Sequence, residues 1–532
     1  MSRILTTDGQ QYVLSEEDRR FGCLIQEGES LTLYTVNDWE DNPAIYSLVT
    51  RLKRTNVNYS LEYKNVFEIE SLYDDKVSHE DPEAPVSSSD MQDHIKNLFE
   101  DAVAAKASDI RIRVDYKKKE TVIRFRIDGD YSVFRKESVA IGSAMIQTMY
   151  ETMTDDTAEE TYKKNQEQEA RISDQSKMPI KLDGIRLSTG PTSNGNLLVA
   201  RLLYDTTGAK NLSDLGISKL HIQKIAYLKK QPYGAILVSG PTGSGKSTLL
   251  EKILNSLYEE TGGRKSLITV EDPPEYEIEY ADQKPVNKQE GESKAQAFAR
   301  TMEKALRQDP DILMIGEIRD SASAKLAIDA AMTGHVVYST IHVSNAISTI
   351  PRLEELGVSF SAITDPNFIK GLINIRLLKK LCDHCKVPLN KALNDNPEKY
   401  KSSTLARIRR SEIRDMNAVY VCGPGCDHCR NGIKGRVPVL ETILVDQKLM
   451  GFLRNRDHIA ASDYVKHHHL TLLKDTVFKI QGGLVDPFMA EETIGLLSQD
   501  KIEEDHVIDE KEVDLEIGDD EQSTDINLGK SA

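Results

Sequence analysis

The stretch GAILVSGPTGSGKSTLLEKILNSLYEE, residues 234–260, decides the fold of this chain. Its first seven residues are mostly apolar and predict a buried strand, and its last fifteen have the spacing of a helix. Between them, GPTGSGKST fits the spacing G-x-x-x-x-G-K-[ST] of a phosphate-binding loop, a motif that stands between a strand and a helix. The sequence therefore predicts an α/β domain built around a nucleotide site.

The predicted loop binds phosphate through its backbone. Glycines let successive N–H groups close around phosphate oxygens, and the start of the helix adds the positive end of its dipole. We expect Lys246 to reach the β- and γ-phosphates of ATP and the Ser247 hydroxyl to help hold Mg²⁺. The flanking strand and helix disfavour the alternative, a Gly-rich turn that matches by chance. The residues predicted to contact the nucleotide are Gly240, Pro241, Thr242, Gly243, Ser244, Gly245, Lys246, Ser247 and Thr248.

Strands and helices alternate after this loop. SLITV (266–270), DILMIGE (311–317) and HVVYSTIH (335–342) have the composition of buried strands, and helical spacing lies between them. Such alternation predicts a mostly parallel sheet that is covered by helices on both faces.

Acidic side chains follow two of these strands. Glu317 ends DILMIGE, the place where an acid of a phosphoryl-transfer site serves the metal. EDPPEYEIE (271–279) holds Glu271, Asp272 and Glu275, and its two prolines fix the backbone and so aim the acids. We expect one of these three acids to orient or deprotonate the attacking water. The alternatives are a solvated strand-end acid for Glu317 and an acidic surface loop for the cluster.

Two histidines bracket the strand within TGHVVYSTIH (333–342). Seven positions separate His335 from His342, which puts them on opposite faces of a strand. At about 3.3 Å per residue they lie roughly 23 Å apart. They are therefore not predicted to share a metal ion, and buried core histidines remain the alternative.

Composition narrows the class of protein. The chain has 532 residues and a formal net charge of −17, and residues 501–532 alone carry 12 acidic and 3 basic side chains. The rest of the chain is mildly acidic, which argues against broad nucleic-acid binding. No apolar run reaches the roughly 18 residues of a transmembrane helix, and the first residues do not form a signal peptide. We expect a cytoplasmic protein.

Five of the six cysteines lie between residues 382 and 429. LCDHC and GCDHC supply two C-x₂-C pairs, Cys382/Cys385 and Cys426/Cys429, and four thiolates suit tetrahedral Zn²⁺. Cys422 could replace Cys426, and reduced buried cysteines without metal are the alternative. Residues 467–469, HHH, are predicted to form a solvated helix face rather than a metal site.

The chain resembles the secretion-ATPase superfamily of type II secretion and type IV pilus systems. GPTGSGKST, EDPPEY, LRQDPDILMIGEIRD and TGHVVYSTIHVSNA stand in the order of that family's Walker A loop, aspartate box, Walker B strand and histidine box. The resemblance covers about residues 95 to 445. It implies a RecA-like ATPase domain behind a PAS-like α+β domain, assembled as a hexameric ring.

The resemblance also assigns roles to single residues. Glu275 matches the proposed general base, and Glu317 matches the acid that serves Mg²⁺. His342 matches the histidine that senses the γ-phosphate, and His335 the one that couples the site to its surroundings. Arg186 and Arg201 match arginines that reach a nucleotide at a domain or subunit boundary; surface arginines on a sheet are the alternative.

A tetracysteine zinc element is implied as well. NGIKGRVPVLE, just after the second cysteine pair, resembles a segment that accompanies this element in the assembly-type members of the family. Two departures concern communication between subunits. The family's His-Ile-Glu-Pro is Arg111-Ile112-Arg113-Val114 here, and its Glu-Thr-Ala is replaced by Ala322-Ser323-Ala324.

Pattern and resemblance together predict seven segments. They are an N-terminal partner-docking domain (1–80), a linker (81–92), the PAS-like domain (93–205), the RecA-like domain (206–375), the zinc element (376–445), a helical region (446–502) and an acidic disordered tail (503–532).

The function implied is an ATP-hydrolysing motor for assembly of a type IV pilus or a type II secretion pseudopilus. The motor would be peripheral at the cytoplasmic face of the inner membrane, where it would act on a platform protein and engage a cytoplasmic-ring accessory protein. EDPPEY and the short N-terminal domain lean toward type IVb or plasmid-encoded pili. The alternatives are a DNA-translocating ATPase of a conjugation or packaging system and a binding scaffold with a degenerate site.

Overall fold

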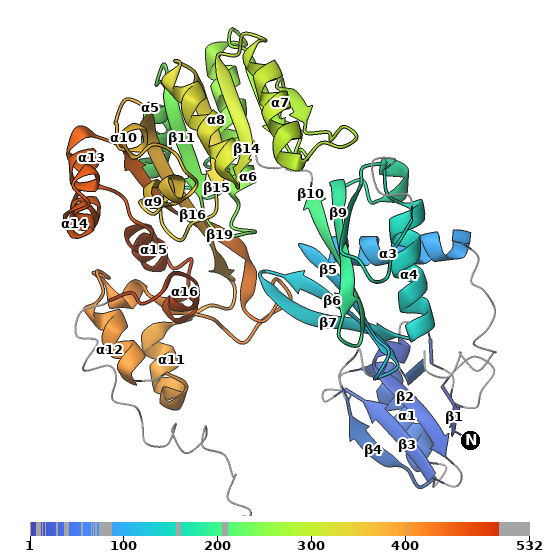
Figure 1. The fold of residues 1–532 in the computed structure, drawn as a ribbon. Coiled ribbons are helices and arrows are strands. Elements are labelled where there is room, and N and C mark those ends of the chain that lie inside the picture. The colour runs from blue at the N-terminus through green and yellow to red at the C-terminus, as the bar shows by residue number, and fades with distance from the viewer. Residues whose placement is uncertain are drawn as a thin grey trace, which may run out of the picture. The chain divides into compact units, whose positions relative to one another are not determined.

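The computed structural model describes most of the chain in two compact units, residues 1–91 and 92–532 (Figure 1). Most of the predicted linker (81–92) and all of the predicted acidic tail (503–532) lie outside the described residues. The described residues are 2–6, 12, 14–15, 18–27, 30–36, 42–54, 57–64, 66, 69, 72–73, 88–155, 161–204, 211–400 and 402–498.

The first unit contains a four-stranded sheet in the order β1-β2-β3-β4. The strands are β1 (Ser2–Ile4), β2 (Gly22–Glu27), β3 (Ser30–Thr35) and β4 (Ser60–Tyr63). The β3–β4 pair is parallel, and helix α1 (Pro43–Arg54) lies between these two strands in the chain. A helical crossover is the usual way to join parallel neighbours.

The second unit begins with an antiparallel six-stranded sheet in the order β7-β6-β5-β10-β9-β8. Alternate residues of β5 are buried, which is the pattern of a sheet with one face covered. Helices α3 (Ser88–Ala104) and α4 (Val139–Thr152) lie on that face (Figure 1). The strands are β5 (Asp109–Asp115), β6 (Glu120–Ile127), β7 (Asp130–Glu137), β8 (Gln168–Ile172), β9 (Leu182–Thr192) and β10 (Gly195–Tyr204).

A seven-stranded sheet follows in the order β13-β12-β14-β15-β11-β16-β19. Every neighbouring pair is parallel except β16 and β19, so the prediction of a mostly parallel sheet is confirmed. The strands are β11 (Gly234–Ser239), β12 (Leu267–Glu271), β13 (Asp282–Pro285), β14 (Ile312–Ile318), β15 (Val336–Ile341), β16 (Ile369–Leu381) and β19 (Ile433–Leu444).

Helices cover both faces of this sheet, as predicted. Successive residues of one strand point to opposite faces, and on β11 Ala235 joins one apolar core whereas Ile236 joins the other. Helices α5 (Lys219–Lys229) and α6 (Lys246–Thr261) close the second core. The helices on the first core are α7 (Lys294–Leu306), α8 (Ser321–Met332), α9 (Thr349–Glu355), α10 (Phe360–Ile363), α13 (Gln447–Arg454) and α14 (His458–His468).

A third apolar core lies beside the long strands β16 and β19. It contains Leu378 and Val439 from these strands and Ile480 from α15. The two ends of the segment predicted as a zinc element (376–445) therefore belong to β16 and β19, and only its middle part lies between these strands. The remaining elements here are β17 (Val387–Pro388), α11 (Leu389–Asp395), α12 (Ser402–Arg410), β18 (Tyr420–Val421), α15 (Leu472–Gln481) and α16 (Pro487–Ile494). Among the described residues, no helix is long and apolar enough to cross a membrane.

Candidate active site

The phosphate loop connects β11 to α6, as the sequence predicts. Gly240, Gly243 and Gly245 have φ values of 148°, 74° and 91°, a range that suits glycine. At Gly240 a Cβ atom would lie 2.6 Å from the carbonyl oxygen of Ile375. Two separate features therefore require glycine in this motif: the positive φ values of the loop backbone and the close approach of Gly240 to β16.

Lys246 is held against its own loop. Its Nζ donates to the carbonyl oxygens of Gly240 and Pro241, at 3.0 Å each, and lies 3.4 Å from Nε2 of His342. The side chain is buried, and this burial lowers the pKa of Lys246 to about 8, although the nearby carboxylates of Glu317 and Glu275 oppose the shift. Among the described residues no carboxylate forms an ion pair with this buried ammonium, so it is well placed to receive an anionic phosphate.

Glu275 connects the phosphate loop to the six-stranded sheet. Its Oε2 accepts a hydrogen bond from Oγ of Ser247 at 2.6 Å, and its Oε1 lies 3.5 Å from Nη1 of Arg186 on β9. Arg171 on β8 also donates to the carbonyl oxygen of Pro274. The residue predicted as the base thus touches both the predicted Mg²⁺ ligand and one of the predicted arginines.

The other two candidate acids of this loop, Glu271 and Asp272, have different partners. Glu271 is buried and accepts hydrogen bonds from Thr269 and Gln283, at 2.7 and 2.9 Å, and burial raises its pKa. Asp272 forms an ion pair with Lys294 at 2.8 Å. The motif alone left all three acids open and the family resemblance pointed to Glu275; of the three, the structure places only Glu275 against a residue of the phosphate loop.

Glu317, near the end of β14, contacts the side chains of Arg319 and His342. Its Oε2 lies 2.7 Å from Nη2 of Arg319, and its Oε1 lies 3.1 Å from Nε2 of His342. Burial and the charge of Lys246 lower the pKa of His342, with Glu317 opposing them. The ring is therefore neutral at physiological pH, and it lies between the loop lysine and the acid.

His335 and His342 lie directly before and after β15, so the prediction that one strand separates them is confirmed. Nδ1 of His335 lies 3.1 Å from the carbonyl oxygen of Ala330, and the backbone carbonyl of His335 accepts a hydrogen bond from Gly234. His335 is thus engaged by local structure at the start of the strand, and His342 reaches the phosphate loop.

Arg201 lies beside Arg186 because their Cα atoms are register partners across β9 and β10. Nε of Arg201 bonds to Oδ1 of Asp109 at 3.0 Å, whereas Arg186 reaches Glu275. Both arginines line one cavity of about 970 Å³ together with Lys246, and residues of both sheets form its walls. This volume is ample for a nucleotide.

The same cavity contains four arginines that the sequence motifs did not single out as site residues: Arg126, Arg319, Arg376 and Arg436. Arg319 lies two residues after Glu317, and Arg436 lies in the NGIKGR segment, so a local sequence motif could have pointed to both. Arg376 lies on β16 outside any motif, and only the pairing of β16 with β11 brings it to the site. The added positive charge favours an anionic ligand.

The loop after His342 is held by a buried acid that sequence reasoning also missed. Glu441 on β19 accepts a hydrogen bond from the Ala346 amide at 2.8 Å, and Arg376 donates to the carbonyl oxygen of Ser344 at 2.5 Å. Burial raises the pKa of Glu441. The antiparallel β16–β19 pair therefore fixes the segment that leads away from His342.

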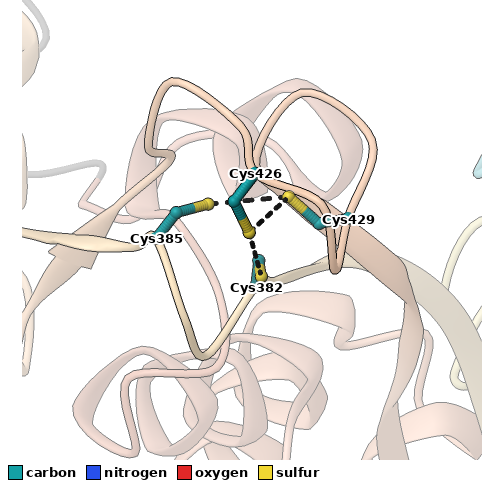
Figure 2. A group of neighbouring side chains, drawn as sticks. All are labelled: Cys382, Cys385, Cys426 and Cys429. Atoms are coloured by element: carbon teal, nitrogen blue, oxygen red, sulfur yellow. Dashed lines mark hydrogen bonds between the residues drawn. The ribbon is translucent and has the colours of Figure 1, made fainter.

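The four predicted cysteine ligands form one cluster (Figure 2). Sγ atoms of Cys382 and Cys426 are 3.7 Å apart, and those of Cys385 and Cys429 and of Cys426 and Cys429 are 3.6 Å apart. A tetrahedral ion with Zn–S bonds of about 2.3 Å separates its ligands by about 3.8 Å. The donor set and the spacing both fit Zn²⁺.

The structure groups Cys426 rather than Cys422 with the other three cysteines. Sγ of Cys422 instead donates to the carbonyl oxygen of Asn431 at 3.2 Å. Burial acts to raise the pKa of Cys382, but hydrogen bonds from the His384 and Cys385 amides outweigh it and lower the pKa to about 7. A thiolate, the form that binds metal, is therefore accessible at this position near neutral pH.

A phosphate loop flanked by acids, a histidine and arginines, on a mostly parallel sheet, defines a P-loop nucleoside triphosphatase. The family model described as "Type II/IV secretion system protein" matches residues 86–503. The chain belongs to this family, which confirms the resemblance drawn from the motifs.

Two relatives show the extent of the similarity. The type IV pilus assembly ATPase PilB of Thermus thermophilus is 34% identical over 487 residues, which are 84% of this chain and 51% of that protein. The chain thus spans about half the length of this relative. The type II secretion system ATPase E of Vibrio cholerae is 31% identical over 400 residues, covering 73% of this chain and 72% of that protein.

Among solved structures, the Legionella pneumophila ATPase DotB is similar with a TM-score of 0.52. The match covers 78% of this chain and 97% of that chain at 19% identity. At this identity the likeness concerns the fold alone.

Proposed function

We propose that this chain is an ATP-hydrolysing motor that powers assembly of a type IV pilus or of a type II secretion pseudopilus at the cytoplasmic face of the inner membrane. The names of the two relatives support this function. The observation that carries the ATPase assignment is the chain of contacts from Ser247 through Glu275 to Arg186, at 2.6 and 3.5 Å.

The residues at the loop fit ATP with Mg²⁺. Backbone N–H groups of the loop and the Lys246 ammonium bind the phosphates. Ser247 and Glu317 offer the hydroxyl and carboxylate oxygens that Mg²⁺ prefers, and we assign them to the ion. When bound, Mg²⁺ supplies charge stabilisation at the phosphate oxygens.

Glu275 acts as the general base in this proposal. Its carboxylate accepts the proton of the attacking water, and the ion pair with Arg186, 3.5 Å away, orients it. The same guanidinium, together with that of Arg201, faces the charge that develops on the γ-phosphate. Hydrolysis therefore needs groups from both sheets of the second unit.

His342 reports the state of the γ-phosphate. Its neutral ring lies near both Lys246 and Glu317, at 3.4 and 3.1 Å, so a phosphate that draws Lys246 away from its carbonyl partners alters the contacts of the histidine. The neighbouring strand β15 then connects this change to His335 at its other end, which couples the site to its surroundings.

At the scale of the assembly, we propose a homo-hexameric ring with a RecA-like ATPase domain (206–375) behind a PAS-like domain (93–205). Nucleotide binds between these two domains, hydrolysis changes their relative rotation, and the ring turns an inner-membrane platform protein. Residues 1–80 dock a partner, with a cytoplasmic-ring accessory protein as a further partner. The four cysteines hold Zn²⁺, which stabilises the segment between β16 and β19.

Phosphate release from the purified full chain tests the ATPase assignment. Lys246→Ala should abolish turnover and weaken ATP binding, because one ammonium serves several phosphate oxygens. Glu275→Gln should retain ATP binding and lose about 10²–10⁴-fold in kcat, the usual contribution of a general base. Glu277→Gln, an exposed acid of the same loop, is the matched control.

Wild-type turnover in Glu275→Gln would remove Glu275 as the base. Turnover that requires or rises strongly with added DNA would favour a DNA-translocating ATPase over the secretion motor.

A further inference from the structure

A second, smaller pocket lies apart from the phosphate loop. It has a volume of about 450 Å³ and is formed by α5, the end of β19, the end of α14 and the start of α15. We call it the basic pocket, and the residues that matter here are Lys224, Tyr227, His467, His468, His469 and Lys474. None of them belongs to the proposed ATPase machinery.

Two lysines bring positive charge into the basic pocket. Nζ of Lys224 donates to the carbonyl oxygen of Thr442 at 3.3 Å, and Nζ of Lys474 donates to the carbonyl oxygens of Lys466 and His469. Within the described part of the chain, neither ammonium has a carboxylate within ion-pair distance. An ammonium has three N–H donors, so these contacts leave donors on both lysines for a ligand.

Two acids on the surrounding elements have partners of their own, and Asp446 also interacts electrostatically with His469. Asp475 accepts a hydrogen bond from the Leu440 amide at 2.9 Å and faces His221 at 3.6 Å, and Asp446 bonds to the Tyr464 hydroxyl at 2.6 Å. The two lysines repel each other, and no described carboxylate is ion-paired with either of them, so an anion between them would relieve this repulsion.

His469 supplies an independent observation. Its side chain is only 7% exposed, and neither ring nitrogen has a hydrogen-bond partner among the described residues. Buried polar groups without partners are rare in folded proteins and call for a ligand or water. His467 and His468 are exposed, so the prediction of a solvated helix face holds for these two and is wrong for His469.

Apart from Gln223, the remaining walls of the basic pocket are largely apolar. Leu220 and the ring of Tyr227 are each 57% exposed at its rim, and Leu444 lies inside it. The pocket therefore combines two ammonium groups and an unpartnered imidazole with aromatic and aliphatic surface. A ligand that matches it carries a compact dianion on an apolar or aromatic body.

We propose that the basic pocket binds a phosphate monoester through Lys224, Lys474 and His469. A phosphate dianion matches the two positive charges, and its oxygens accept the N–H donors that the protein leaves without partners. The phosphate could belong to a soluble ester or to a lipid headgroup such as phosphatidic acid. The chemistry is the same in both cases, and the experiment separates the two sources.

The soluble source is tested by calorimetry with phenyl phosphate on the full chain. A non-hydrolysable ATP analogue and Mg²⁺ are present throughout, so that the phosphate loop is filled. We expect one additional site per chain, weakened at least about tenfold in the Lys224→Gln/Lys474→Gln variant because two charge-assisted contacts are lost. Lys117→Gln/Lys118→Gln, which removes two exposed lysines elsewhere, is the matched control and should bind as the wild type does.

The lipid source is tested by co-sedimentation with vesicles of phosphatidylcholine, with and without phosphatidic acid. Binding that requires phosphatidic acid and is lost in the Lys224→Gln/Lys474→Gln variant, but not in the control, supports a headgroup ligand. Binding of phenyl phosphate alone supports a soluble ester. The proposal is overturned if neither probe binds, or if the variant binds as tightly as the wild type while its melting temperature shows that it is folded.

Discussion

Glu275 is the residue at which the two sheets of the second unit meet the phosphate loop. Its two carboxylate oxygens have different partners, the Ser247 hydroxyl on one side and the Arg186 guanidinium on the other. Among the three candidate acids of EDPPEYEIE, namely Glu271, Asp272 and Glu275, geometry rather than composition separates Glu275 from the other two. Glu271 and Asp272 each have a local partner that occupies them.

Lys246 permits a prediction about pH. Its pKa is lowered to about 8 in the nucleotide-free protein, and bound phosphate would raise it again, so nucleotide binding takes up a proton above that pH. We expect ADP affinity to be nearly constant below pH 8 and to fall by up to about tenfold per unit above it, because only the ammonium form binds phosphate. Calorimetric titrations of ADP between pH 7 and 9.5 measure this dependence.

A second buffer with a different ionisation enthalpy should reveal the proton uptake directly in the observed heat. An ADP affinity that stays flat up to pH 9.5 would show that Lys246 remains charged in the free protein.

At the scale of elements, the sequence predicted the local motifs but not which strands pair with one another across the seven-stranded sheet. The strand, loop and helix around GPTGSGKST could be read from the sequence because each depends on neighbours within one short segment. Arg376 and Glu441 could not, because β16 and β19 join the sheet only through pairing between distant segments. The contact of Glu441 with Ala346, for example, spans 95 positions. His469 illustrates the same limit, since only tertiary packing distinguishes it from two histidines beside it.

The β16–β19 pair yields a prediction about the loop after His342. Glu441→Ala removes the acceptor of the Ala346 amide and should cost about 1–3 kcal/mol in the free energy of unfolding, the usual cost of a buried group left unsatisfied. It should also lower kcat, because the segment following His342 loses its anchor. Chemical denaturation and phosphate release measure the two effects.

Glu441→Gln keeps an acceptor oxygen, and burial already disfavours the charged form of Glu441. This conservative variant should therefore recover most of the stability and turnover. If it is as damaged as Glu441→Ala, the carboxylate has a role other than holding the loop.

The cysteine cluster yields a prediction about metal. Elemental analysis should find about one Zn²⁺ per chain, and Cys382→Ser or Cys429→Ser should release it, because structural zinc needs four ligands. Cys422→Ser should retain the metal, since its Sγ bonds to the carbonyl oxygen of Asn431. If Cys426→Ser keeps the zinc and Cys422→Ser loses it, Cys422 rather than Cys426 is the fourth ligand. If the wild-type protein is stable and contains no metal, the proposed zinc site is wrong.

At the scale of the whole molecule, the second unit contains one site made by two sheets. The seven-stranded sheet supplies the phosphate loop, Glu317 and His342, and the six-stranded sheet supplies Arg186 and Arg201. Neither sheet alone has both the phosphate-binding loop and these arginines. In the proposed motor, hydrolysis can be coupled to movement between domains because the two sheets contribute different groups to the same site.

The most direct test of this account is the ATP turnover of Arg186→Ala in the full chain, measured beside its affinity for ADP. Arginines that stabilise the transition state of phosphoryl transfer are worth about 10³–10⁵ in rate. We therefore predict a loss of about 10³-fold or more in kcat with ADP affinity changed by less than about threefold, because the phosphate loop is intact. Arg124→Ala, which removes an exposed arginine of the same sheet, should leave both values unchanged. Wild-type turnover in Arg186→Ala would mean that hydrolysis does not need the Arg186 guanidinium, and it would contradict the account.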